Sequence, residues 1–309
     1  MTSGFSELRG AGLIVVRGED AIAFLHAQLT SDVAGLPPLQ TQYSGYCTPK
    51  GRVRATFLLW HAHEEVMLQL PESLRAELQA TLSRYVLRSR VQLSAATDAL
   101  RLFGVWGGDA PDVLRQIVGD VPGAAHEVAI AEAARVARVP LDRFIVSATA
   151  DRAEDVRAAL RSRMAEEPEV AWSRHEIEAG IPVVLRESQD RYVPQMLNLD
   201  LVGAVSYTKG CYPGQEIVAR MHYLGRLKER MYRIHVPGPG APVVGDALYG
   251  GDFGPEQACG GVLCAAPSGD GYDALAVIQT SSARSGALHW KSLDGPAVQL
   301  KPLPYTVPD

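Results

Sequence analysis

The sequence lacks the features that mark secreted, membrane and metal-binding proteins. Its four cysteines, at positions 47, 211, 259 and 264, form no C-x-x-C pair and show no Cys/His spacing typical of zinc ligands. No apolar run approaches the roughly 20 residues that a membrane helix requires. Residues 1–20 lack the basic start and apolar core of a secretory signal. We therefore expect reduced thiols, a cytoplasmic location, no membrane span and no resident metal.

An excess of positive charge is also missing. The 309 residues include 30 Lys+Arg against 35 Asp+Glu, which gives a net charge of −5. Such a balance creates no overall field that would attract a phosphate backbone, so we expect no direct nucleic-acid partner. There is no fixed-period repeat and no low-complexity tract. A hydrophobic content of 47% and a length beyond that of a single core indicate a folded chain with more than one unit.

The order of apolar patterns predicts an α+β fold. Residues 12–17 form a buried-strand pattern, residues 48–51 (Thr-Pro-Lys-Gly) supply a hairpin turn, and residues 71–86 show helical spacing. Strands that come in adjacent groups between helices favour mixed, mostly antiparallel sheets. From about residue 226 the pattern changes to short strands broken by Gly and Pro, which is typical of a small β-barrel. We predict two domains, 1–225 and 226–309.

The stretch KGCYPGQE, residues 209–216, carries the strongest chemical signal. Pro213 suits the first position of a helix, which would place Cys211 just before a helix N-terminus. Unpaired backbone N–H groups there, and the cation of Lys209, both lower a thiol pKa. The alternative is a cysteine that only packs. His222 falls at the far end of the predicted helix, so a protease-like Cys-His pair is not supported.

A second feature is WSRHEIEAGIP, residues 172–182. It predicts a helix that Gly180 and Pro182 end, with Arg174 and Glu178 four residues apart on one face. A solvated ion pair is one interpretation. The other is that the carboxylate accepts paired N–H donors from a flat heterocycle such as a pterin.

The segment that follows, residues 191–210, mixes aromatic, amide and glycine residues. Gln195 and Asn198 either bond nearby backbone or bind the exocyclic groups of a ring. The basic clusters at 226–230 (RLKER) and at arginines 84, 88 and 90 are typical of solvated faces, with receipt of an anionic tail as the alternative.

In this order and spacing, KGCYPGQEIVAR, RHEIEAGIP and YVPQMLNLD resemble the YgfZ family of folate-binding proteins linked to iron-sulfur proteins. The family signature K-G-C-Y-x-G-Q-E is complete here, and FLHAQLTSDV (24–33) and YCTPKGRVRA (46–55) resemble the N-terminal elements of the family. The resemblance is clear over residues 11–60 and 174–231. The wider relatives are the aminomethyltransferases, or T-proteins, of the glycine cleavage system.

The resemblance implies a T-protein-like folate-binding body with a C-terminal β-barrel. It also implies a tetrahydrofolate-binding accessory protein that supports assembly or repair of iron-sulfur enzymes, including tRNA-modifying ones, through contacts with iron-sulfur client or assembly proteins. Glu178 matches the glutamate that grips the pterin in T-proteins. Gln195, Asn198 and Arg220 are expected to line the same cavity, and Cys211 with Lys209 to perform thiol chemistry.

One departure from the T-proteins bears on function. Those enzymes carry acidic residues after the hairpin glycines, whereas here Gly51 is followed by Arg-Val-Arg-Ala-Thr, residues 52–56. The missing carboxylate argues against glycine cleavage. Two alternatives stay open: a folate-dependent aminomethyltransferase-like enzyme, and a folate-independent scaffold for protein partners.

Overall fold

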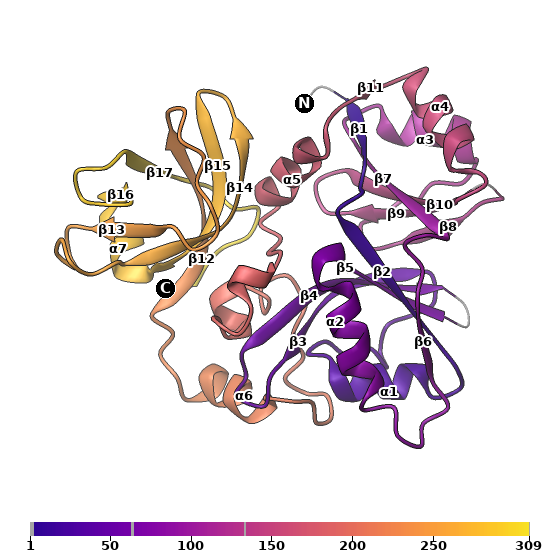
Figure 1. The fold of residues 1–309 in the computed structure, drawn as a ribbon, viewed down its shortest axis with the longest axis horizontal. Coiled ribbons are helices and arrows are strands. Elements are labelled where there is room, and N and C mark those ends of the chain that lie inside the picture. The colour runs from indigo at the N-terminus through magenta and orange to yellow at the C-terminus, as the bar shows by residue number, and fades with distance from the viewer. Residues whose placement is uncertain (1–2, 63–64, 133, 309) are drawn as a thin grey trace. The chain divides into compact units, whose positions relative to one another are not determined.

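The computed structural model describes residues 3–62, 65–132 and 134–308, and its elements are labelled in Figure 1. The chain divides by internal contacts into two compact units. The first comprises Met1–Gln28, Asp32–Tyr43 and Phe57–Trp172, and the second comprises Leu29–Ser31, Ser44–Thr56 and Ser173–Asp309. The two units are defined by the contacts within each of them, and these contacts do not tell which segments fold independently. The domain boundary at residues 225/226 therefore stays a prediction.

A six-stranded sheet forms one part of the first unit. Its order is β11-β1-β7-β10-β9-β8, with β1 and β11 parallel and the other pairs antiparallel. The helices α3 and α4 pack on one face, where Leu114 and Leu160 are fully buried. The elements are β1 (Gly4–Glu7), β7 (Leu100–Trp106), α3 (Ala110–Val118), β8 (Val128–Ile130), β9 (Ala134–Val139), β10 (Arg143–Thr149), α4 (Ala153–Arg161) and β11 (Ala165–Glu166).

A second sheet has the order β3-β4-β5-β2-β6, and residues 44–56 at the hairpin end of β3 and β4 belong to the second unit. The predicted strand and hairpin turn are confirmed. The predicted helix ends at Ser83, three residues early, and its leucines at 74, 78 and 82 are buried. The elements are β2 (Ala11–Arg17), α1 (Ala21–Gln28), β3 (Gln40–Cys47), β4 (Val53–Ala62), β5 (Glu65–Pro71), α2 (Glu72–Ser83) and β6 (Gln92–Ala95).

The second unit contains a closed barrel of order β12-β15-β14-β13-β16-β17, which confirms the predicted C-terminal barrel. The α+β fold class is likewise confirmed. The barrel elements are β12 (Glu229–Pro237), β13 (Ala247–Gly250), β14 (Gly260–Ser268), β15 (Gly271–Gln279), α7 (Thr280–Ser285), β16 (Leu288–Trp290) and β17 (Ala297–Lys301). Before it come α5 (Glu169–Glu178), the 3-10 turns η1 (Arg186–Ser188) and η2 (Pro194–Leu197), and α6 (Gln215–Tyr223).

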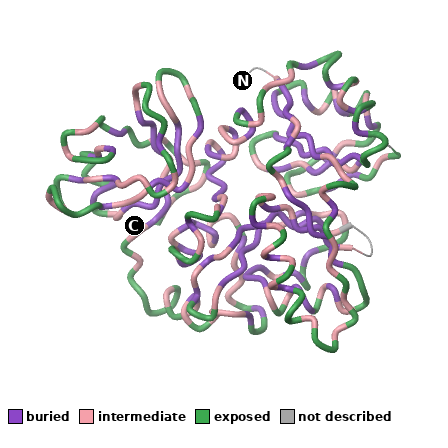
Figure 2. The backbone as a smooth tube through the Cα atoms, viewed as in Figure 1, coloured by how far each residue is buried: buried purple, intermediate pink, exposed green. Residues whose placement is uncertain are grey.

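Burial follows these elements closely. Figure 2 shows buried residues along the strands, whereas the chain between α6 and β12 is mostly exposed. An exposed connection of this kind is where binding residues commonly lie, because its backbone needs no partner other than water.

Candidate functional site

The buried lysine of the KGCYPGQE stretch anchors the loop that carries Cys211. The Lys209 ammonium donates hydrogen bonds to the carbonyl oxygens of Leu29 at 2.6 Å and Ser31 at 3.0 Å. The Ser206 amide donates to the carbonyl between them, that of Thr30, at 2.9 Å. Three consecutive carbonyls therefore hold this loop, and charge-assisted bonds of this kind are the stronger ones. Whether the same cation also activates Cys211 stays a prediction.

Helix α6 begins later than the sequence indicated. It starts at Gln215, and Gly214 before it has a left-handed φ of 81°, so the prediction that Pro213 is the first helical residue is wrong. A Cβ at position 214 would lie 2.6 Å from the Cα of Gly51 and would also collide with the Thr48 carbonyl oxygen. Gly214 has no Cβ and tolerates the left-handed backbone. It therefore lets α6 pack directly on the hairpin turn, which a residue with a side chain would prevent.

Exposure distinguishes Cys211 from the other cysteines. Cys47 and Cys259 are buried, Cys264 is partly buried, and Cys211 is exposed. Burial, with a smaller effect of the Asp190 charge, raises the pKa of Cys47 to about 12. A thiol in that condition is inert at neutral pH, because the thiolate is the nucleophile. Cys211 is therefore the thiol that a partner or substrate can reach.

Glu178 lies at the end of α5 as a half-buried carboxylate. Its Oε2 is 2.9 Å from Nδ1 of His175, and its Oε1 is 3.8 Å from a guanidinium nitrogen of Arg233. The hydrogen bond from His175 lowers the pKa of Glu178 against the opposing effect of burial, and the charge of Arg174 contributes only a smaller Coulombic effect. The hydrogen-bond partner is therefore His175, three residues away, and not the predicted Arg174. The carboxylate stays ionised at neutral pH.

Strand β12 contacts three of the four residues predicted to bind folate. Arg230 donates to the Gln195 carbonyl at 2.9 Å, and the side-chain amide of Asn198 donates to the Met231 carbonyl at 2.8 Å. Arg233, the next arginine along the strand, makes the contact with Glu178 described above. The start of the barrel therefore holds these three residues around one strand, although Glu178 precedes Gln195 by 17 residues and Asn198 by 20.

Two buried amide oxygens have unusual surroundings. The Gln195 amide donates from Nε2 to the Val218 carbonyl at 2.8 Å and to the Tyr207 hydroxyl at 3.2 Å. Because a carbonyl only accepts, these bonds fix which end of the amide is oxygen. Oε1 of Gln195 and Oδ1 of Asn198 are then buried with no hydrogen-bond partner among the described residues. Buried acceptors without donors are costly, so a donor that reached either oxygen, from water or from a ligand, would stabilise it.

Gln195 also borders a cavity of 340 Å³ at the C-terminal end of α6. Its wall includes Asp200 and Arg230, joined by two hydrogen bonds of 2.7 and 3.0 Å, together with His222 and Arg226. Arg220, the fourth predicted folate contact, is exposed on α6. Sequence patterns did not pair Asp200 with Arg230, because the two residues lie 30 positions apart, at the ends of the separate segments YVPQMLNLD and RLKER.

The hairpin after Gly51 carries a cation where T-proteins carry acidic residues. Arg54 forms two hydrogen bonds to Asp190, at 3.2 and 3.1 Å, and Arg52 donates to the Arg191 carbonyl at 2.6 Å. The position is thus occupied by a paired guanidinium, which cannot act as a proton acceptor in aminomethyl transfer.

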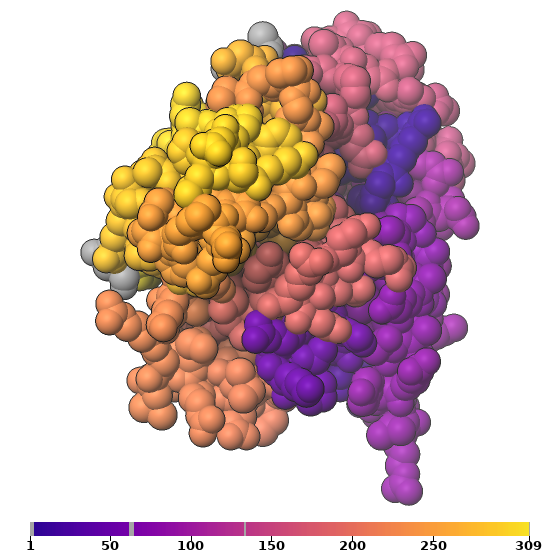
Figure 3. All heavy atoms as spheres, turned by 60° about the vertical axis from the view of Figure 1, so that its left-hand side comes forward, coloured from indigo at the N-terminus to yellow at the C-terminus, as the bar shows by residue number. Residues whose placement is uncertain are grey.

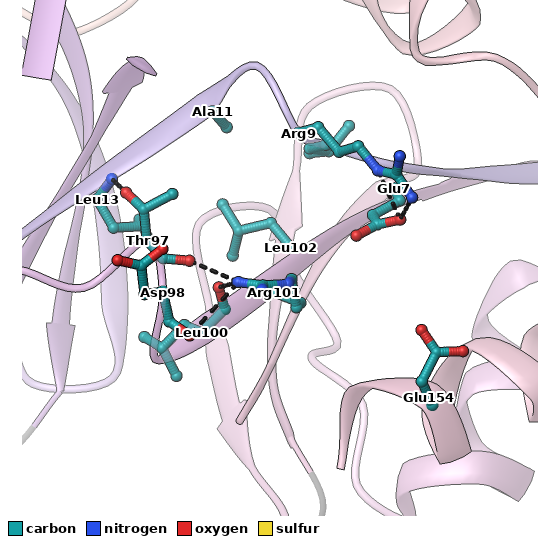
Figure 4. A pocket seen from close by; sticks show the side chains of 11 residues that line it. Glu7, Arg9, Ala11, Leu13, Thr97, Asp98, Leu100, Arg101, Leu102 and Glu154 are labelled. Atoms are coloured by element: carbon teal, nitrogen blue, oxygen red, sulfur yellow. Dashed lines mark hydrogen bonds and ion pairs between the residues drawn. The ribbon is translucent and has the colours of Figure 1, made fainter. Parts of the chain in front are cut away.

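A second cavity, of 410 Å³, lies in the first unit (Figure 4). Arg9 points toward Glu7, with a hydrogen bond of 2.8 Å, and Arg101 donates to the Thr97 carbonyl at 2.7 Å. Its two arginines are thus engaged by partners within the wall, so this cavity is the weaker candidate.

Neither a metal cluster nor a membrane helix is found in the described part of the chain. Over residues 3–62, 65–132 and 134–308, no three His, Cys, Asp or Glu side chains are grouped to hold a metal ion. No helix in these ranges is long and apolar enough to cross a bilayer.

Comparison with known proteins identifies the family. Residues 2–153 match the family described as the GCVT N-terminal domain. The glycine cleavage system aminomethyltransferase T of Bartonella henselae is 18% identical, with a TM-score of 0.79 over 98% of this chain and 86% of that one, which shows a shared fold. The tRNA-modifying protein YgfZ of Yersinia enterocolitica is 28% identical over 96% of this chain and 90% of its own length. That of Sodalis glossinidius is 30% identical with the same coverage. The chain therefore belongs to the YgfZ family.

Proposed function

We propose that this protein binds tetrahydrofolate, or a one-carbon derivative of it, and serves tRNA modification. Its YgfZ relatives are named tRNA-modifying proteins, and its fold is that of an aminomethyltransferase. More specifically, the protein supports assembly or repair of iron-sulfur enzymes, including those that modify tRNA, through contacts with iron-sulfur client or assembly proteins. The family resemblance of the KGCYPGQE stretch supports this assignment.

The observation that carries the folate proposal is that β12 contacts three residues with free acceptor capacity: Gln195 and Asn198, whose amide oxygens are buried and unpartnered among the described residues, and the ionised Glu178. A reduced pterin presents N–H donors along one edge. Glu178 accepts hydrogen bonds from these donors, and Gln195 and Asn198 accept hydrogen bonds from the remaining N–H groups. Arg220 contributes a cation at the exposed end of the site. When bound, tetrahydrofolate supplies a carrier for one-carbon units.

Calorimetry with tetrahydrofolate tests the binding proposal. Glu178→Gln should weaken binding by about 1–3 kcal/mol, because a charge-assisted pair becomes a neutral one. Glu187→Gln is the matched control, since it makes the same change of charge at an exposed position. Equal affinities of the two variants for tetrahydrofolate would show that the pterin does not contact Glu178. If the unmodified protein gives no heat of binding at millimolar tetrahydrofolate, the folate proposal is refuted and the folate-independent scaffold is the remaining function.

The thiol role is assigned to Cys211, the exposed cysteine. One cysteine does not hold an iron-sulfur cluster, which usually takes four ligands, so any contact with a cluster requires ligands from the client. Cys211→Ser should keep folate affinity and lose support of iron-sulfur tRNA-modifying enzymes in cells, measured as the level of the modified nucleoside. Cys264→Ser serves as the control. Full complementation by Cys211→Ser contradicts the thiol role.

The aminomethyltransferase alternative is less well supported. The hairpin position that carries an acid in T-proteins carries Arg54, which is paired with Asp190. Formation of methylene-tetrahydrofolate by the purified protein from an aminomethyl donor would revive this alternative.

A further inference from the structure

The chain around the end of α6 is locally basic, although the whole protein is acidic. From Ile217 to Lys228 there is no Asp or Glu, whereas Arg220, Arg226 and Lys228 are all present and exposed. The net charge of the chain is −5, so the charge of this segment is opposite in sign to that of the chain as a whole. In Figure 3 the light-orange segment that contains α6 lies at the surface at the lower left. A local positive field attracts a polyanion even where the total charge is negative.

His222 and Tyr223, which end α6 within this segment, belong to a cluster of aromatic rings, and His222 lines one cavity wall together with Arg226. The rings of Tyr207 and His222 are stacked, with centroids 3.7 Å apart and planes inclined by 13°. Tyr223 meets His222 edge-on at 4.7 Å and Tyr207 at 6.3 Å. The hydrogen bond from Gln195 to the Tyr207 hydroxyl fixes the inner ring. The outer ring, Tyr223, is therefore held by its neighbours while 65% of its surface stays exposed.

Exposed rings flanked by cations favour one class of partner. Protein interfaces also use Tyr and Arg, but they are depleted of lysine. Single-stranded nucleic acid is bound by lysine as well as arginine, because cations contact phosphates while aromatic rings stack on unpaired bases. Leu224, which is 84% exposed beside Tyr223, adds apolar contact area for a base or sugar.

We propose that the surface formed by Tyr223, Leu224, Arg226 and Lys228 binds a single-stranded segment of RNA. Tyr223 stacks on an unpaired base, and the two cations contact the flanking phosphates. The choice of RNA over other polyanions rests on the proposed role in tRNA modification. The overall charge predicted no nucleic-acid partner, because a net charge averages over the surface and does not register a local cluster.

The loop after α2 provides a matched control within the same chain. It also exposes Tyr85 next to a basic residue, Arg84, with Arg88 close by. Its third arginine, Arg90, is already paired with Glu19. The two surfaces are therefore similar in composition, and the stacked rings distinguish the proposed RNA surface.

Fluorescence anisotropy with a labelled RNA stem-loop and the full-length protein tests the proposal. Tyr223→Ala should weaken binding by about fivefold or more, which is the effect of losing one stacked base. The double variant Arg226→Gln/Lys228→Gln should reduce the slope of log K against log salt by about 1.4, the value for two phosphate contacts on a single strand. Tyr85→Ala and Arg84→Gln/Arg88→Gln should leave affinity and slope unchanged. A blunt RNA duplex of equal length should bind more weakly than the stem-loop.

Four results would overturn the proposal: no binding of the stem-loop, equal losses in the control variants, equal binding of the duplex, or unchanged RNA affinity in Tyr223→Ala. If Tyr223→Ala keeps RNA affinity and loses binding to an iron-sulfur client, the surface belongs to a protein partner. Tetrahydrofolate calorimetry on the same preparations separates this inference from the proposed function. Folate binding without RNA binding refutes only the RNA surface, and RNA binding without folate binding refutes only the folate site.

Discussion

Replacing Gly214 by alanine probes how the KGCYPGQE stretch is held in place. Two separate costs arise. The backbone has a φ of 81°, which a residue with a Cβ adopts only at a cost of about 1–2 kcal/mol. The new Cβ would lie 2.6 Å from the Cα and 2.7 Å from the nitrogen of Gly51. These are backbone atoms that cannot rotate away, and overpacking of this kind costs about 1–3 kcal/mol.

The free energy of unfolding should therefore fall by about 2–5 kcal/mol in Gly214→Ala. Gly203→Ala is the matched control, because its φ of 73° is also left-handed but nothing lies within 4 Å of the added Cβ. It should lose only the conformational cost, about 1–2 kcal/mol.

Urea denaturation followed by circular dichroism measures both variants against the unmodified protein. The difference between the two losses, about 1–3 kcal/mol, isolates the contact between the motif and the hairpin turn. If the two variants lose the same stability, the close approach of Gly214 to Gly51 does not contribute, and the reasoning is refuted.

Three further predictions concern individual side chains. Lys209→Met should lower the free energy of unfolding by about 2–4 kcal/mol in urea titrations, because two charge-assisted bonds to buried carbonyls are lost; a loss below the error of the titration would contradict this anchoring role. In the native protein one thiol should react rapidly with Ellman's reagent, and Cys211→Ser should abolish that phase while Cys47 reacts only on unfolding; a surviving fast phase would point to another cysteine. Burial raises the pKa of Asp273, but hydrogen bonds from Arg233 and from a histidine outweigh it, so the folded pKa is lowered. Its stabilisation is therefore complete above the ordinary pKa of 3.8 and is lost as the pH falls through the folded value. Asp273→Asn should flatten the acid limb of a plot of stability against pH, and an unchanged limb would show that other carboxylates control it.

Local chemistry accounts for the parts of the fold that were predicted correctly. The turn at Thr48–Gly51 and the end of α5 near Gly180 both depend on residues within a few positions of one another. Short strands such as β8 (Val128–Ile130) and β11 (Ala165–Glu166) were not predicted. Two or three residues show no periodicity, and such strands exist only because a neighbouring strand supplies their hydrogen bonds.

The sequence by itself determined the fold class, the C-terminal barrel and the family, because these depend on repeated local patterns and on a complete motif. Only the tertiary structure decided what the motif's side chains contact. Lys209 bonds carbonyls 178 and 180 residues away, and Arg54 bonds a carboxylate 136 residues away. The grouping of Glu178, Gln195 and Asn198 around β12 is likewise a matter of packing. Pairings across such distances depend on how sheets and helices assemble, and no local pattern encodes that assembly.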